Sequence, residues 1–300
     1  MTADSLPVLT LGGYLGAGKT TLLNHLLRNA DGRRLAVLVN EFGELPIDED
    51  LIEAQDDELI SIAGGCICCS FGNDLIGALN ELSGMMPRPD YVIIESSGVA
   101  IPGAIVSTLS LLDGVHSDGI VVLADAETIQ TAAKDDYIGD TITRQLSDAE
   151  IVVLTKMDLV DTAMAEEVEA WLGQTAPQAA IIPSQQGQVA PEALLGVVEK
   201  PGTGHDGPHA DKLFDSMVIR PPDGTPPDAL AKRLATGGFG IVRAKGHLPG
   251  PDGACWLVQT VGKRFEAVPS PQRFETGVVC LGLRGQLDRD AIARLIAETV

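Results

Sequence analysis

The chain has 300 residues, of which 45% are hydrophobic and 21% charged, a composition typical of a soluble globular protein. Aspartate and glutamate number 42 against 21 lysines and arginines, and the resulting formal net charge of −21 argues against nucleic acid and anionic membranes as partners. The length allows two cores at roughly 150 residues each, and no apolar run approaches the ~18 residues of a membrane helix. Residues 1–7 lack a signal-peptide pattern, so we expect a cytoplasmic protein.

From residue 6 to about residue 200, short apolar runs alternate with helical patterns, which predicts βαβ units and a mostly parallel sheet. Strands are expected at residues 8–11, 35–40, 91–95, 120–125, 151–155 and 180–183. The helix after the first strand carries a leucine stripe that would pack on the sheet, formed by Leu22, Leu23, Leu26 and Leu27. Another helix is expected to start at Asp161 or Thr162 and to end near Pro177.

A phosphate-binding motif lies between the first strand and the leucine-striped helix: Gly13-Tyr14-Leu15-Gly16-Ala17-Gly18-Lys19-Thr20. Glycines let backbone N–H groups approach phosphate oxygens, and the helix N-terminus adds positive potential. Lys19 would neutralise the β- and γ-phosphates, and the Thr20 hydroxyl would bind Mg²⁺. The predicted nucleotide-binding residues of this loop are Gly13, Gly16, Ala17, Gly18, Lys19, Thr20 and Thr21.

The second strand is followed by an acidic stretch, residues 40–48, at the place where phosphate-loop GTPases have their first switch. Acidic loop residues are usually solvated, but Glu41, Glu44 or Asp48 can also sense Mg²⁺ or complete a second metal site. A loop that contacts both metals would be ordered by the γ-phosphate and would relax after hydrolysis.

Three of the five cysteines fall in the run Cys66-Ile67-Cys68-Cys69. Three thiolates can fill three positions of a Zn²⁺ tetrahedron at Zn–S ~2.3 Å, whereas Cu(I), Co²⁺ and Ni²⁺ are also compatible with such donors. A redox pair is the alternative, but in a reducing compartment clustered cysteines favour a metal site. Cys255 and Cys280 lie in apolar, strand-like runs and are expected to be ordinary core residues.

Glu95 ends the strand predicted at residues 91–95 and is the favoured second Mg²⁺ carboxylate, with Gly98 close behind to approach the γ-phosphate. Asp125 ends the next strand and is an alternative, although an aspartate at a strand end is often only a turn residue.

Guanine specificity is predicted from Thr155-Lys156-Met157-Asp158, which follows an apolar strand. The Asp158 carboxylate can accept hydrogen bonds from the guanine N1 and N2 donors, which adenine lacks, while the Lys156 stem covers the base. Ser184 is a candidate to complete the base pocket.

Residues 200–210 are rich in proline and glycine and predict a linker. Beyond it we expect strands at residues 214–220, 240–244, 256–261, 265–268 and 278–283, and helices at 227–235 and 288–298. The expected organisation is therefore an α/β nucleotide-binding domain over 1–200, a linker over 201–211 and a small α+β domain over 212–300.

Together these motifs resemble the CobW-type family of P-loop GTPase metallochaperones. The matching elements are residues 12–24, Asn40-Glu41-Phe42-Gly43-Glu44, Gly65-Cys66-Ile67-Cys68-Cys69, Glu95-Ser96-Ser97-Gly98, residues 155–158 and Val242-Arg243-Ala244-Lys245-Gly246. The resemblance implies a protein that binds GTP and a divalent metal, hydrolyses GTP slowly and delivers the metal to a client protein. It also implicates the cysteines, together with a glutamate of the loop matching Glu41–Glu44, in metal binding.

Three departures from the family pattern stand out: Thr155 where asparagine is usual, Pro46 where glycine is frequent, and only His205 and His209 in the linker. No glutamine or arginine is clearly placed in the sequence to orient water, so slow GTP hydrolysis is expected. Zinc is the favoured cargo. The alternatives are a cobalt-handling protein of cobalamin biosynthesis or nitrile hydratase activation, and a redox-sensing, GTP-regulated binding protein.

Overall fold

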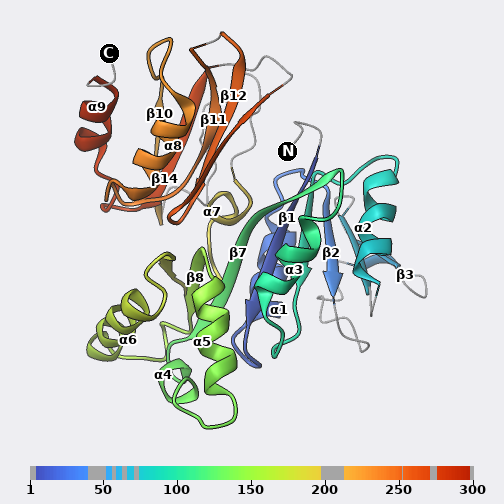
Figure 1. The fold of residues 1–300 in the computed structure, drawn as a ribbon. Coiled ribbons are helices and arrows are strands. Elements are labelled where there is room, and N and C mark those ends of the chain that lie inside the picture. Colours follow the sequence, from blue (N-terminus) through green and yellow to red (C-terminus); the bar gives the residue numbers. More distant parts are fainter. Residues whose placement is uncertain are drawn as a thin grey trace. The chain divides into compact units, whose positions relative to one another are not determined.

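The computed structural model describes residues 5–39, 74–196, 213–251, 253–270 and 276–297, and the backbone of three short strands between residues 52 and 70. The chain divides into two compact units, residues 4–189 and residues 190–300 with 1–3 (Figure 1). The predicted linker, residues 201–211, lies outside the described residues. In the described part of the chain, no helix combines the length and apolarity needed to cross a membrane.

The first unit is built on a nine-stranded sheet in the order β3-β4-β5-β2-β6-β1-β7-β8-β9. Its strands are β1 (Leu6–Gly13), β2 (Leu35–Val39), β3 (Ile52–Gln55), β4 (Leu59–Ile62), β5 (Cys66–Ser70), β6 (Tyr91–Glu95), β7 (Val115–Asp125), β8 (Ile151–Thr155) and β9 (Ala180–Pro183). Pairing is parallel from β5 to β9, which confirms the predicted mostly parallel sheet. The antiparallel strands β3 and β4 at one edge were not predicted.

Helices lie on both sides of this sheet; Figure 1 shows α3 and α5 in front of the strands and α1 behind them. The helices are α1 (Lys19–Arg28), α2 (Leu75–Gly84), α3 (Pro102–Leu109), α4 (Ile129–Ala132), α5 (Gly139–Asp148) and α6 (Thr162–Thr175). The leucine stripe of α1 is buried, as predicted. Asp161 caps α6, because its carboxylate accepts a hydrogen bond from the Met164 N–H at 2.9 Å.

The second unit has a five-stranded antiparallel sheet in the order β10-β14-β11-β12-β13. Its elements are α7 (Pro191–Leu195), β10 (Phe214–Ile219), α8 (Pro227–Thr236), β11 (Ile241–Pro249), β12 (Cys255–Val261), β13 (Arg264–Pro269), β14 (Gly277–Leu283) and α9 (Arg289–Ala297). The predicted small α+β domain is therefore confirmed, although β11 runs five residues further than expected.

The two isolated cysteines of the second unit differ in burial. Cys280 lies in the core between sheet and helices, and burial raises the pKa of its thiol to about 12. Cys255 opens β12 and is only half-buried, so the expectation that it is a core residue was wrong. Because Cys255 is the first residue of its strand, fewer neighbouring residues cover it.

Candidate functional site

The phosphate loop connects β1 directly to α1. Gly13 has φ 131°, and a Cβ there would lie 2.7 Å from the Leu123 carbonyl oxygen, so only glycine is accommodated. Lys19 opens α1 and is 9% exposed; its Nζ donates to the Gly13 carbonyl at 2.8 Å and to the Tyr14 carbonyl at 3.3 Å. The ammonium group is thus folded over the loop whose backbone would surround the phosphates.

The carboxyl end of β6 brings Glu95 beside the strand that carries the phosphate loop. Glu95 is buried and pairs in register with Leu11 of β1. The next residue, Ser96, donates both its N–H and its hydroxyl to the Leu11 carbonyl, at 2.9 and 3.1 Å. Thr20 stands in the first turn of α1. A hydroxyl and a carboxylate are the hard oxygen donors that Mg²⁺ prefers, so the residues present are compatible with that ion.

The segment after β6 lies directly against the phosphate loop. A Cβ on Gly98 would lie 2.7 Å from Leu15 Cδ2 and 3.0 Å from the Leu15 backbone nitrogen, so a larger residue would displace the loop. The structure also brings a residue here that the sequence did not suggest. Gln145 of α5 is 2% exposed, and its Nε2 donates to the carbonyls of Gly98 and Ala100.

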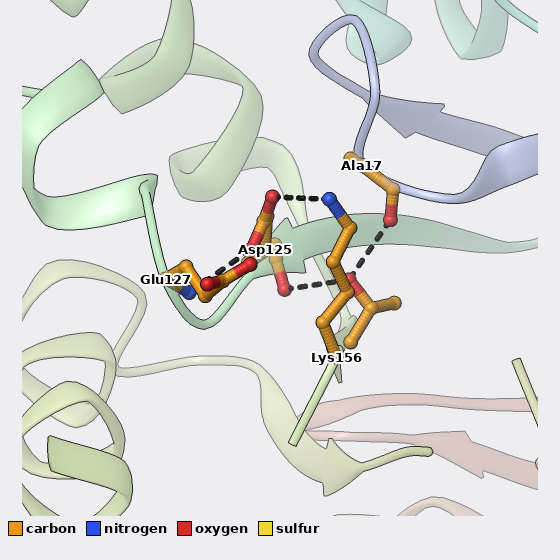
Figure 2. A network of polar contacts seen from close by, with 6 residues as sticks. Ala17, Asp125, Glu127 and Lys156 are labelled. Carbon is orange, nitrogen blue, oxygen red and sulfur yellow. Dashed lines mark hydrogen bonds and ion pairs between the residues drawn. The ribbon is translucent and has the colours of Figure 1, made fainter. Parts of the chain in front are cut away.

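Thr155 and Lys156 connect the end of β8 to the phosphate loop and to β7. The Thr155 hydroxyl contacts the Ala17 carbonyl at 2.9 Å and the Ala124 carbonyl at 3.2 Å. Figure 2 shows the Lys156 amine beside the Asp125 carboxylate, at 2.7 Å, while the other Asp125 oxygen accepts from the Glu127 N–H at 2.9 Å. Asp125 therefore holds Lys156, a different role from the alternative Mg²⁺ ligand considered from the sequence.

The predicted base-binding residues meet in the loops after β8 and β9. Asp158 is exposed in the turn after β8. Ser184 is buried; its carbonyl accepts from the Met157 N–H at 3.2 Å, and its hydroxyl donates to the Gln188 carbonyl at 3.2 Å. One backbone hydrogen bond thus joins the two loops, and the exposed Asp158 carboxylate is accessible to a ligand.

The cysteine run forms strand β5, which pairs with β2 on one side and with β4 on the other. Val39, the last residue of β2, pairs with Ser70 of β5 and with Glu95 of β6. The candidate ligands Glu41 and Glu44, and the side chains of Cys66, Cys68 and Cys69, lie outside the described residues. Where side chains are described, no group of three or more metal-binding residues is found.

Residues 7–183 match the family model described as CobW/HypB/UreG, nucleotide-binding domain. The chain belongs to this family. The zinc chaperone CobW of a Sinorhizobium species is 29% identical over 98% of this chain and 97% of its own length. The zinc-regulated GTPase metalloprotein activator 1 of Schizosaccharomyces pombe is 36% identical, over 54% of this chain and 41% of the relative. The structure of the Zn(II)-bound YjiA GTPase from E. coli is similar with a TM-score of 0.53 and 27% identity, covering 99% of each chain.

The match to the CobW/HypB/UreG family model covers the nucleotide-binding and cysteine motifs of the first unit. The matched residues include the phosphate loop, the cysteine strand and the Thr155–Asp158 segment. The second unit lies outside the match to the family model, but the Sinorhizobium CobW and E. coli YjiA alignments extend over it. Both units therefore have counterparts in similar proteins.

Proposed function

We propose that the protein is a slow, cytoplasmic GTPase that acts as a zinc metallochaperone, loading zinc in its GTP state and passing it to a client metalloprotein after hydrolysis. The names of its relatives support this: a zinc chaperone, a zinc-regulated GTPase metalloprotein activator, and a GTPase with Zn(II) bound. The structural observation that carries the proposal is the position of β2, between the cysteine strand β5 and the Glu95 strand β6.

In the proposed nucleotide site, Lys19 and the amides of the phosphate loop stabilise the charge that develops on the transferred phosphoryl group. Thr20 and Glu95 would hold Mg²⁺, which when bound neutralises charge on the phosphate oxygens. Asp158 selects guanine and Lys156 covers the base. The nucleotide-binding residues are those of the phosphate loop with Gly98, Thr155, Lys156 and Asp158.

In the proposed zinc site, the thiolates of Cys66, Cys68 and Cys69 bind the cargo ion together with Glu41 or Glu44. The support is topological: β2 ends at Val39, level with Ser70 on one neighbour and Glu95 on the other, and the acidic residues 40–48 come next in the sequence. A change at the γ-phosphate that moves this loop would therefore alter the zinc ligands, which couples hydrolysis to release.

The test is a competition titration of Zn²⁺ against a chromophoric chelator, with a non-hydrolysable GTP analogue or with GDP bound. We expect at least tenfold tighter zinc binding in the GTP-analogue state, a coupling of about 1.4 kcal/mol. Cys68→Ser should abolish the nucleotide dependence. Cys255→Ser removes a thiol far along the sequence and is the matched control. Equal zinc affinity in both nucleotide states would contradict the coupling.

A further inference from the structure

Helix α5 holds the segment after β6 through the side chain of Gln145. The Nε2 of Gln145 donates to the Gly98 carbonyl at 3.1 Å and to the Ala100 carbonyl at 2.7 Å. Both partners are carbonyl oxygens, so the amide must present its NH₂ group, and only that group offers two hydrogens. Gln145 is 2% exposed, so water cannot replace either bond without disturbing the helix.

A second side chain of α5, that of Asp148, holds the same segment at Gly103. Asp148 Oδ2 accepts from the Gly103 N–H at 2.9 Å, and Gly103 is the second residue of α3. This N–H belongs to the first turn of α3, where no backbone carbonyl of the helix can accept it. Gln145 and Asp148 are three residues apart and so lie on one face of α5. Together they hold the backbone from Gly98 to Gly103.

The phosphate loop fixes the segment from the other side. Leu15 fills the space where a Gly98 side chain would stand, and Pro102 packs against Gly12 of β1. The backbone through Gly98 is therefore held between α5 and the phosphate loop before any nucleotide binds. A fixed hydrogen-bond donor binds an anion more tightly than one that must first be ordered.

We propose that Gln145 is a positioning residue for GTP: it fixes the Gly98 backbone where the γ-phosphate would lie, and so sets the preference for GTP over GDP. The proposal rests on the proposed function of this site, since it assumes that the nucleotide is GTP. Gln145 acts through Gly98 and need not touch the nucleotide. Its NH₂ group is committed to two carbonyls, so it does not orient the attacking water.

The test compares affinities for GDP and for a non-hydrolysable GTP analogue in Gln145→Met, which keeps the side-chain length but has no donor. We expect the GTP analogue to bind about tenfold more weakly and the GDP affinity to change by less than about twofold. The two neutral hydrogen bonds of Gln145 hold the backbone at Gly98, and this backbone would contact the γ-phosphate, which GDP lacks. Arg144→Ala is the matched control, because Arg144 precedes Gln145 in α5, its side chain is 65% exposed, and it forms an ion pair with Asp140 at 3.8 Å. It should leave both affinities unchanged.

A second pair of variants separates positioning from a general loss of structure. Asp148→Ala removes the acceptor for the Gly103 N–H and should weaken the GTP analogue about threefold, a typical effect of one hydrogen bond, whereas Asp148→Asn keeps an oxygen acceptor and should match the wild type. Equal losses for both nucleotides in Gln145→Met, or an unchanged ratio, would overturn the proposal. If Gln145→Met does not fold, the Asp148 pair decides. If the wild-type protein binds neither nucleotide, it is the proposed function that fails.

Discussion

Single side chains tie the predicted site together over long sequence distances. Thr155 reaches Ala17, and Gln145 reaches Gly98. The motif residues themselves could be predicted, because Gly13, Lys19 and Asp158 occur in local patterns with a chemical meaning. Gln145 could not, since its partners are backbone carbonyls 45 or more residues away and any residue type has a carbonyl. Sequence patterns therefore reveal candidate ligand-binding groups better than the groups that would hold them in place.

Thr155 replaces the asparagine usual in the family, yet its hydroxyl still contacts the phosphate loop. Thr155→Val keeps the shape and removes the donor, which leaves the Ala17 and Ala124 carbonyls without this partner in a buried site. We expect about tenfold weaker binding of both GDP and the GTP analogue, from the loss of roughly 1.4 kcal/mol. The measurement is fluorescence titration of labelled nucleotides. Thr155→Ser retains the hydroxyl and should bind like the wild type; an equal loss in both variants would contradict this role.

At the scale of elements, most strands of both units were predicted, whereas the three short strands between residues 52 and 70 were not. β6, β8 and β9 have the predicted bounds. β7 begins at Val115, five residues before the predicted start. The prediction began too late because the polar but buried Asp118 interrupts the apolar pattern of this strand. The Tyr91 hydroxyl donates to the Asp118 carboxylate, and that partner makes the polar residue tolerable inside a sheet. A pattern of apolar residues cannot reveal such a partner on another strand.

β1 carries a polar group without this compensation. The Thr10 hydroxyl is fully buried, and no residue in the described part of the chain forms a hydrogen bond with it. Thr10→Val replaces the hydroxyl by a methyl group of similar size, and valine suits a strand equally well. We expect the first unit to gain about 1 kcal/mol of stability, seen as a higher melting temperature in calorimetry. Thr10→Ser keeps the unpaired hydroxyl and should not stabilise; a melting point lowered by Thr10→Val would mean that the hydroxyl has a partner.

At the scale of the whole molecule, the five cysteines occupy three different positions in the fold. The run Cys66–Cys69 forms an inner part of the sheet, Cys255 is half-buried in the second unit, and Cys280 is fully buried there. Because a thiolate is the reactive form, the raised pKa of Cys280, about 12, keeps it protonated and unreactive at neutral pH. Thiol reactivity can therefore distinguish a zinc site from a redox pair in the intact chain.

We expect alkylation of the reduced native protein at pH 7.5 to modify Cys66, Cys68 and Cys69 readily without metal, Cys255 slowly, and Cys280 only after unfolding. One equivalent of Zn²⁺ with the GTP analogue should protect the three clustered thiols together and leave Cys255 unchanged, because zinc ligands are bound as thiolates to a single ion. Mass spectrometry of tryptic peptides gives the extent of modification at each cysteine. Protection of only two thiols, lost on adding a reductant, would instead indicate a disulfide and favour the redox-sensing alternative. Protection of all three thiols in the GTP state but not in the GDP state would show that zinc binding depends on the bound nucleotide.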